Sequence, residues 1–445
     1  MSPELVKRYS APVPRYTSYP TAPHFSPNVS ADTYRAWLAE LPADVRLSLY
    51  FHIPFCDSLC WYCGCCTKAV QRYEPVAEYL TSLYAEAAHV AGLLPAGHEV
   101  AHIHWGGGSP NILTPDDIGH LAETHRRLFR VREDAEFAVE IDPRGLDDAR
   151  IAAFARAGVT RVSLGIQDFD TKVQAAINRK QSFAETQAAV TGFRAHGVEA
   201  LNVDLVYGLP HQTRASLQNT VEQVLELRPT RIAAFGYAHL PERLKHQRLI
   251  PTATLPDTVE RFAQASRLAR ILMRSGYVRI GLDHFALPDD PLAKGQLARN
   301  FQGYTTDTAD TLIGLGASAI GRLPQGYVQN HPATAEYARR IANDGLATSR
   351  GIALTDNDRM RGFVIERLMC DLAFPARELR TRYGHQSEEI LREARALLEA
   401  DQDRLIESDG EAFRVTDRGR PFVRTIAACF DSYLDATTAR HAPGV

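Results

Sequence analysis

Five of the seven cysteines of the chain fall between Cys56 and Cys66, in the segment FHIPFCDSLCWYCGCC. Cys56, Cys60 and Cys63 have the spacing Cys-x3-Cys-x2-Cys and directly follow an apolar run that predicts a β-strand. Thiolates are soft ligands that suit iron–sulfur clusters or zinc, and so short a loop can wrap three of them around one four-iron, four-sulfur cubane. Three protein ligands leave the fourth iron open to a small molecule.

The alternative is a structural zinc site formed by the same three cysteines with Cys65 or Cys66. Structural zinc sites usually pair two Cys-x2-4-Cys half-sites across a longer spacer. The chain offers no second half-site, because its two remaining cysteines lie far apart and alone. The pattern therefore favours the cluster, and Trp61 and Tyr62 inside the loop suit a cluster that is shielded from water.

The elements that must position this loop are a series of βα units. From Arg46 onward, apolar β-branched runs alternate with helix-length segments, which predicts a parallel sheet. Right-handed crossovers curl six such units into a partial (β/α)6 barrel of the TIM type, whose ligands lie at the carboxyl ends of the strands. The residues expected at those ends are Cys56, Gly106, Gly107, Gly108, Glu140, Gln167 and Asp204.

Three kinds of residue near the loop could bind a ligand or take part in the reaction. The glycines of HWGGG let backbone groups approach a ligand closely. Glu140 needs a cation or donors inside an apolar barrel, either from a ligand or from a nearby residue such as Arg144. His52 can move a proton near neutral pH, and we predict it as a catalytic residue, although a lone histidine on a strand is more often simply packed and hydrogen-bonded.

The rest of the chain predicts appendages to this barrel. We expect an N-terminal arm over residues 1–45, the radical-chemistry barrel over 46–240, a barrel extension and cap over 241–355, and a helical, winged-helix-like domain over 356–445. The Asp409-Gly410 pair between apolar runs predicts a tight hairpin in that last domain. Its acidic sequence, LIESDGEAF, argues against phosphate binding.

Composition excludes several functions. A formal net charge of -3 without long Lys/Arg blocks gives no basic surface for nucleic acid or for an anionic membrane. No apolar run approaches the roughly 18 residues of a membrane span, and the start carries no secretory signal. We expect a cytoplasmic monomer.

The cysteine spacing is the signature of the radical S-adenosylmethionine (SAM) superfamily, and the chain as a whole resembles the oxygen-independent coproporphyrinogen III oxidase (coproporphyrinogen dehydrogenase) family. The similar segments run through PRYTSYPTA, YFHIPFC, CGC, HWGGGSP, EIDP, GIQDF, NRKQ, DLVYGLP, YAHLP, DHFALPDD, RNFQGYTT, GASAI and RGIAL. The resemblance implies a [4Fe-4S] cluster and two SAM molecules. Residues matching the cluster-bound SAM site are Tyr50, Gly106, Glu140 and Ile320, and those matching the second are Tyr62, Gly107, Gly108, Gln167, Arg179, Asp204 and Ala238.

The resemblance also implies the reaction: anaerobic oxidative decarboxylation of coproporphyrinogen III to protoporphyrinogen IX, which converts two propionates to vinyl groups in porphyrin and heme biosynthesis. The electron would come from a low-potential donor such as flavodoxin or ferredoxin. Arg15 or Arg299 could meet the substrate carboxylates, and Tyr16 and Tyr19 could fold over it. The alternatives are a heme chaperone of the same family and a radical SAM methyltransferase or cyclopropanase that also uses two SAM molecules.

Two positions depart from the family pattern. Cys66 stands where Asn is usual, and Ser109 follows the third glycine in place of Thr. Ser109 keeps the hydroxyl group of Thr, so we expect this difference to have no effect on the site. Cys66 adds a thiol near the cluster, so we expect cluster assembly or oxidation sensitivity to differ.

Overall fold

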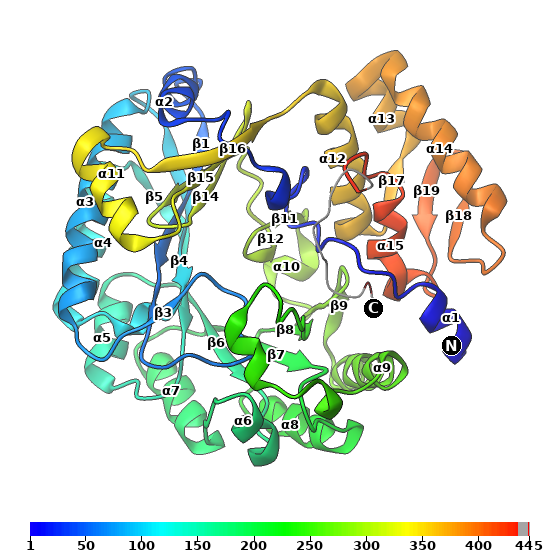
Figure 1. Cartoon of the computed structure of the whole chain (residues 1–445), viewed down its shortest axis with the longest axis horizontal. Coiled ribbons are helices and arrows are strands. Elements are labelled where there is room, and N and C mark those ends of the chain that lie inside the picture. Colours follow the sequence, from blue (N-terminus) through cyan, green and yellow to red (C-terminus); the bar gives the residue numbers. More distant parts are fainter. Residues whose placement is uncertain (435–443, 445) are drawn as a thin grey trace.

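A parallel sheet with helices on its outer face forms the centre of the molecule (Figure 1). The computed structural model describes residues 1–434 and residue 444. The predicted partial α/β barrel is confirmed, because the six central strands pair in parallel in the order in which they occur along the chain. They are β1 (Arg46–Ile53), β4 (Glu99–Gly107), β5 (Val131–Ile141), β6 (Arg161–Gln167), β7 (Ala200–Tyr207) and β8 (Arg231–Gly236). The intervening helices are α3 (Glu74–Leu93), α4 (Pro115–Leu128), α5 (Asp148–Arg156), α6 (Thr171–Ala176), α7 (Phe183–Ala195) and α8 (Arg214–Glu226).

Residues beyond β8 extend this sheet at both edges to twelve strands. At one edge, β10 (His284–Ala286) pairs antiparallel with β8 and is followed by β9 (Val278–Ile280). At the other, β13 (Thr311–Leu315) pairs parallel with β1 and leads to β14 (Ile320–Leu323), β15 (Gly326–Asn330) and β16 (Thr348–Ala353). Part of the segment 241–355, for which we expected a barrel extension and cap, thus forms a strand beside β1. The connecting elements are α9 (Thr258–Arg274), α10 (Pro291–Lys294), α11 (Thr334–Asp344) and the short pair β11 (Ala298–Asn300) and β12 (Gly303–Thr305).

The side chains of strand β1 alternate between the packed face of the sheet and the face that looks into the barrel. Successive side chains of a strand point to opposite faces. The apolar residues from Leu47 to Ile53 belong to the main hydrophobic core that the sheet forms with α3 and α4. The alternate residues, Tyr50 and His52, therefore face the inside of the barrel.

The C-terminal region combines helices with a small sheet. Its helices are α12 (Asp356–Asp371), α13 (Ala376–Tyr383), α14 (Ser387–Ala400) and α15 (Val423–Ala428), and its strands are β17 (Ala373–Pro375), β18 (Ile406–Ser408) and β19 (Ala412–Val415). The predicted hairpin is confirmed, because β18 and β19 pair antiparallel across Asp409-Gly410. Gly410 has φ of 87°, a left-handed conformation that glycine adopts without a steric penalty.

The N-terminal arm packs against this C-terminal region (Figure 1). Between α1 (Pro3–Arg8) and α2 (Ala31–Ala39), Val13, Tyr16 and Tyr19 join a hydrophobic cluster built mainly from α12 to α15. The Tyr16 hydroxyl donates to the Asp431 carboxylate at 3.0 Å, and the Tyr19 and Ser432 hydroxyls lie 3.0 Å apart. Both arm tyrosines therefore serve the junction between the arm and the C-terminal region.

Helix α3, the longest helix of the described residues at 20 residues, carries a buried carboxylate. Glu86 accepts hydrogen bonds, each of 2.6 Å, from the Gly316 amide, the Asn330 amide group and the Tyr337 hydroxyl. These contacts hold the turn that leads from β13 to Ile320. No helix in the described part of the chain is both long and apolar enough to cross a membrane.

Burial gives Glu86 a pH-dependent effect on stability. Removal from water outweighs the three donors and raises the pKa of Glu86 from 4.5 to about 7. A raised carboxyl pKa stabilises the folded state fully below the unfolded pKa, and this contribution is lost as the pH rises through the folded pKa. Between about pH 5 and pH 8 we expect the wild type to lose about 3 kcal/mol of unfolding free energy relative to Glu86→Gln. Urea unfolding at a series of pH values measures this difference. The exposed Glu78→Gln on the same helix should follow the wild type, and parallel curves for wild type and Glu86→Gln would contradict the prediction.

Candidate active site

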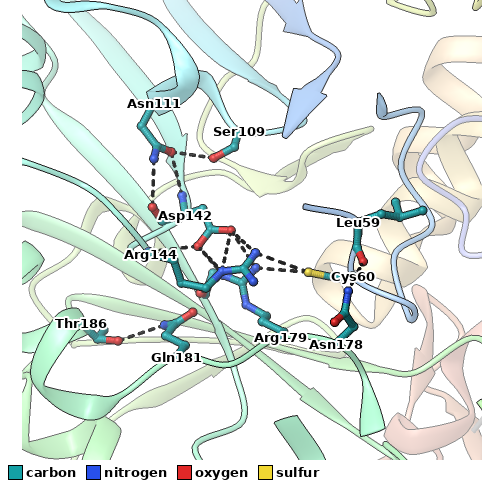
Figure 2. Close-up of polar contacts among 11 residues, drawn as sticks. Leu59, Cys60, Ser109, Asn111, Asp142, Arg144, Asn178, Arg179, Gln181 and Thr186 are labelled. Atoms are coloured by element: carbon teal, nitrogen blue, oxygen red, sulfur yellow. Dashed lines mark hydrogen bonds and ion pairs between the residues drawn. The ribbon is translucent and has the colours of Figure 1, made fainter. Parts of the chain in front are cut away.

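The cysteine loop leaves the carboxyl end of β1 and is fixed at several points. The short strands β2 (Phe55–Cys56) and β3 (Lys68–Ala69) pair in parallel and close it. The Trp61 amide donates to the Ile177 carbonyl at 2.9 Å. The Asn178 side chain donates to the Leu59 carbonyl, also at 2.9 Å (Figure 2). These bonds tie the loop to the segment after α6, across the mouth of the barrel.

Two guanidinium groups point at the most buried of the three cysteines. Cys60 is 7% exposed, whereas Cys56 and Cys63 are half-buried. The Sγ of Cys60 lies 3.5 Å from Nη2 of Arg144 and 3.6 Å from Nη1 of Arg179 (Figure 2). Arg179 was predicted at the second SAM site, and the structure places it in contact with the cysteine loop.

Asp142 organises this pair of arginines. Its carboxylate accepts from Arg144 at 2.6 Å and from Arg179 at 2.9 Å (Figure 2). Burial alone would raise the pKa of Asp142, but the two guanidinium groups hold that pKa below its usual value. The backbone amide of Asp142 also donates to the Asn111 side chain, which fixes the turn after β5. We therefore expect Asp142 to be ionised and to hold both arginines in place.

Sequence reasoning missed Asp142 and weighed Arg144 only as a partner of Glu140. The structure pairs Arg144 with Asp142 instead. One signal was present, since Asp142 follows Glu140 by two residues at the carboxyl end of the same strand, where a second carboxylate faces the same side. Its partner Arg179 lies 37 residues away in the sequence and becomes a neighbour only through the fold.

Replacing Arg144 with Gln should lower the reduction potential of a cluster bound at this loop. Hydrogen bonds and positive charge near a cluster sulfur stabilise the reduced state, so their removal is expected to shift the midpoint potential down on the order of tens of millivolts. A redox titration followed by electron paramagnetic resonance measures the shift. Arg150→Gln is the control, because Arg150 contacts Asp147 and the Leu113 carbonyl but no thiol. An unchanged or higher potential in Arg144→Gln contradicts the prediction.

The three glycines and Glu140 form a second group at the barrel mouth. Glu140 accepts from the Gly107 amide at 3.0 Å and lies 3.2 Å from Nε2 of His104. A Cβ added to Gly106 would come within 2.7 Å of the Glu140 carboxylate, and Gly107 has φ of 109°. Burial raises the pKa of Glu140, but His104 and the Gly107 amide more than compensate, so that pKa lies below the usual value. An ionised Glu140 thus lies directly beside a bare backbone.

His52 is fully engaged inside the protein. Its Nε2 lies 3.1 Å from the Cys66 carbonyl, which can only accept, so Nε2 carries the proton. Its Nδ1 then accepts from the Tyr50 hydroxyl at 2.9 Å. Burial lowers the pKa of His52, which agrees with a neutral ring. The structure brings His52, Tyr50 and the end of the cysteine loop together, and the catalytic role of His52 stays a prediction.

Two of the residues predicted to bind the second SAM molecule are linked by a residue that sequence reasoning missed. The Gln247 amide donates to the Tyr62 carbonyl at 3.0 Å and to the Ala238 carbonyl at 3.1 Å. Asp204 accepts from Ser163 on the neighbouring strand β6 and from Asn202 on its own strand β7, and burial followed by the nearby Glu140 charge raises its pKa to about 6. Within the described residues, Gln167 and Ile320 make no side-chain hydrogen bond to another predicted site residue. Gln167 closes β6 with φ of 70°.

The donor set suits a cubane better than a single ion. In the described residues, no three His, Cys, Asp or Glu side chains converge as a mononuclear site requires. A cubane makes a different demand, because each cysteine binds its own iron. Three thiols on one short loop, with N–H donors directed at the buried one, fit that demand. The bare glycine backbone beside an ionised Glu140 fits the ammonium and carboxylate groups of an amino acid such as the methionine part of SAM.

Comparisons with known proteins agree with this geometry. The profile of the radical SAM superfamily matches residues 50–224, and that of the HemN C-terminal domain matches residues 354–422. The barrel and its three-cysteine loop thus define a radical SAM enzyme. The oxygen-independent coproporphyrinogen III oxidase of Bradyrhizobium diazoefficiens is 48% identical over 97% of both chains, and that of Escherichia coli is 38% identical over 97% of this chain and 95% of its own. The solved structure of coproporphyrinogen III oxidase (HemN) from Escherichia coli superposes with a TM-score of 0.91 at 37% identity and covers 97% of this chain and 99% of its own. The chain belongs to the oxygen-independent coproporphyrinogen III oxidases.

Proposed function

We propose that this enzyme converts coproporphyrinogen III to protoporphyrinogen IX without oxygen, in heme or chlorophyll precursor synthesis. Two propionate side chains each give up a hydrogen atom, CO2 and one electron, which passes to an electron acceptor, and each becomes a vinyl group. The observation that carries the proposal is the three-cysteine loop at the carboxyl edge of the barrel, in a chain whose similarity to the named oxidases covers almost its full length.

The residues of the chain divide the work around that loop. Cys56, Cys60 and Cys63 would hold three irons of a [4Fe-4S] cluster. When bound, the cluster and SAM would supply a 5'-deoxyadenosyl radical able to take a hydrogen atom from the β-carbon of a propionate. Arg144 and Arg179 would direct N–H groups at the Sγ of Cys60, the thiolate that binds one iron of the cluster. His52 would hold the end of the loop through the Cys66 carbonyl.

Two SAM molecules are part of this proposal. For the first, Glu140 and the amides of the glycine turn offer one acceptor and several donors beside the cysteine loop. The residues that we assign to it are Tyr50, Gly106, Glu140 and Ile320. For the second, the Gln247 bridge supports a common site around Tyr62 and Ala238. Its assigned residues are Tyr62, Gly107, Gly108, Gln167, Arg179, Asp204 and Ala238.

The proposal also covers the electron donor, the oligomeric state, the cellular location and the domain division of the enzyme. A low-potential flavodoxin or ferredoxin would deliver the electron, and the enzyme would act as a monomer in the cytoplasm. We retain the division into an arm (1–45), a barrel (46–240), an extension (241–355) and a C-terminal domain (356–445). The packing of arm residues such as Val13 in the C-terminal hydrophobic cluster supports treating the arm and that domain as one functional unit.

An anaerobic assay tests the function. Enzyme reconstituted with iron and sulfide receives coproporphyrinogen III, SAM and a reductant, and the porphyrinogen products and 5'-deoxyadenosine are followed over time. Protoporphyrinogen IX and 5'-deoxyadenosine should both accumulate. Tight heme binding without decarboxylation would instead assign the chain as a heme chaperone, and a methylated or cyclopropane product would assign it to the methyltransferases or cyclopropanases.

A further inference from the structure

Five arginines line a cavity of about 80 Å³ outside the cysteine site. The cavity lies where β8, α9 and β10 of the barrel meet the N-terminal arm and the C-terminal region. Tyr207 and Gly236, at the carboxyl ends of β7 and β8, form part of its wall. It therefore adjoins the edge of the barrel at which the cysteine loop lies. We call it the arginine cavity. Its five arginines are Arg15, Arg261, Arg279, Arg299 and Arg424.

Among the described residues, few acidic side chains face this cavity. Of the described residues that line it, Asp283 is the sole carboxylate, and Asp283 already lies 2.8 Å from Nδ1 of His284. The chain as a whole carries a formal net charge of -3, so the concentration of positive charge is local. Within the described residues, Arg15, Arg261 and Arg279 form no ion pair within 4.0 Å, and neither does Arg299.

Backbone carbonyls hold the guanidinium groups in place. Arg15 donates to the Gly236 carbonyl at 2.8 Å, and Arg261 donates to the Tyr237 carbonyl at 2.5 Å. Arg299 donates to the carbonyl of Tyr16 at 3.2 Å. Such bonds orient the guanidinium groups without pairing them with a carboxylate, although the charges of Asp283 and Glu366 are among the causes that raise the pKa of Arg299 despite its burial.

Two N–H groups of the cavity find no acceptor among the residues that the structure describes. Arg299 is 8% exposed, and its Nη1 is buried without a hydrogen-bond partner. The Nε of Arg261 is buried and unpaired in the same way. An unsatisfied buried donor on a charged group costs more than a neutral one, because its desolvation is not repaid by a bond. A carboxylate in the cavity would supply the missing acceptors.

The electrostatics point in the same direction. Burial and the neighbouring Arg15 lower the pKa of Arg424 to about 10. Burial and Arg420 lower the pKa of Arg279, and burial and Arg15 contribute to the same direction for Arg261. Arg15 therefore repels both Arg261 and Arg424, Arg420 repels Arg279, and a bound anion would relieve that repulsion.

We infer that the arginine cavity binds a carboxylate arm of the substrate, namely a propionate that the reaction leaves intact. The inference rests on the proposed function, which makes the substrate a porphyrinogen with several propionates. The size of the cavity suits a single carboxylate arm and not a macrocycle. Anchoring one arm here would place the remaining macrocycle across the ends of β7 and β8, toward the cysteine loop.

Binding of coproporphyrin III, the stable oxidised macrocycle with the same propionates, tests the inference directly. Fluorescence quenching gives its Kd for the full-length enzyme and for Arg261→Gln and Arg279→Gln. Each substitution removes a charge-assisted hydrogen bond, so we expect Kd to rise by at least about tenfold. Arg270→Gln, on the exposed side of α9, is the matched control and should bind as the wild type does. The methyl ester of the same macrocycle should bind wild type and variants equally weakly.

Several outcomes would overturn the inference. Wild-type affinity in both Gln variants would do so, as would ester binding as tight as that of the free acid. If Arg261→Gln lowers the thermal unfolding temperature, Arg261→Lys separates charge from structure. A tighter Kd for Lys than for Gln supports a carboxylate site, and equal values argue against it. The proposed function fails separately, when the wild type binds coproporphyrin III but converts no coproporphyrinogen III. The inference alone fails when the wild type is active and Arg261→Gln keeps its KM.

Discussion

Cys60→Ser enzyme is expected to retain its fold but to form neither 5'-deoxyadenosine nor protoporphyrinogen IX at a detectable rate. A serine hydroxyl is a harder and less acidic ligand than a thiol, so it does not replace a thiolate on iron. Cys60 is also the cysteine that both Arg144 and Arg179 approach. Iron content after anaerobic reconstitution and product formation measure the effect together, and circular dichroism reports the fold.

The control for this variant is Cys429→Ser. Cys429 is exposed at the end of α15, far along the chain from the loop, and it should leave iron content and turnover as they are in the wild type. Cys66→Ser addresses the extra thiol next to the loop, and we expect it to slow the loss of cluster in air. Turnover by Cys60→Ser would show that the cluster is bound elsewhere.

Gly108→Ala is predicted to be the most damaging single-methyl addition at the site. The new Cβ would lie 2.4 Å from the carbonyl oxygen and 2.7 Å from the amide nitrogen of Phe55. Both atoms are backbone, and the next residue is Cys56, so relief of the clash must move the cysteine loop. Overpacking of this kind costs about 1–3 kcal/mol, and we expect loss of iron binding in addition. Thermal unfolding of the protein and its iron content after reconstitution are the measurements.

Gly119→Ala provides the matched control. Gly119 lies within α4, and a Cβ there meets no atom within 4 Å. Alanine is favoured over glycine inside a helix by about 1 kcal/mol, so this variant should be slightly more stable and should keep its iron. If Gly108→Ala instead behaves like Gly119→Ala, then the glycine turn is not the constraint on the loop that its geometry indicates.

The strands of the barrel and the cysteine loop were accessible from sequence because their signals are local. Each strand contains a run of mainly apolar residues, and Cys56, Cys60 and Cys63 lie within a few residues of one another. Likewise, the Asp409-Gly410 turn needs only its own two residues and the flanking apolar runs.

What escaped prediction depends on pairing between distant segments. Strand β13 begins at Thr311 yet pairs with β1, which begins at Arg46, so no local pattern distinguishes it from a cap. The contact of Arg179 with Asp142 has the same origin, because β5 and β6 bring the two turns together. Gln247 carries no local signal in the sequence, and only the fold places it between two backbone carbonyls.

The docking of the N-terminal arm constrains the order in which the protein can be completed during its synthesis. Arg424 donates to the carbonyl of Pro14, and 410 residues separate the two in the chain. At translation rates of about 5–20 residues per second, the arm leaves the ribosome roughly 20 to 80 seconds before its partner exists. The barrel strands and the cysteine loop are synthesised within that interval, whereas Arg15 and Arg424 can meet only afterwards. The nascent chain can therefore assemble its radical-generating half before the arginine cavity is complete, and its binding site for a carboxylate arm is finished last.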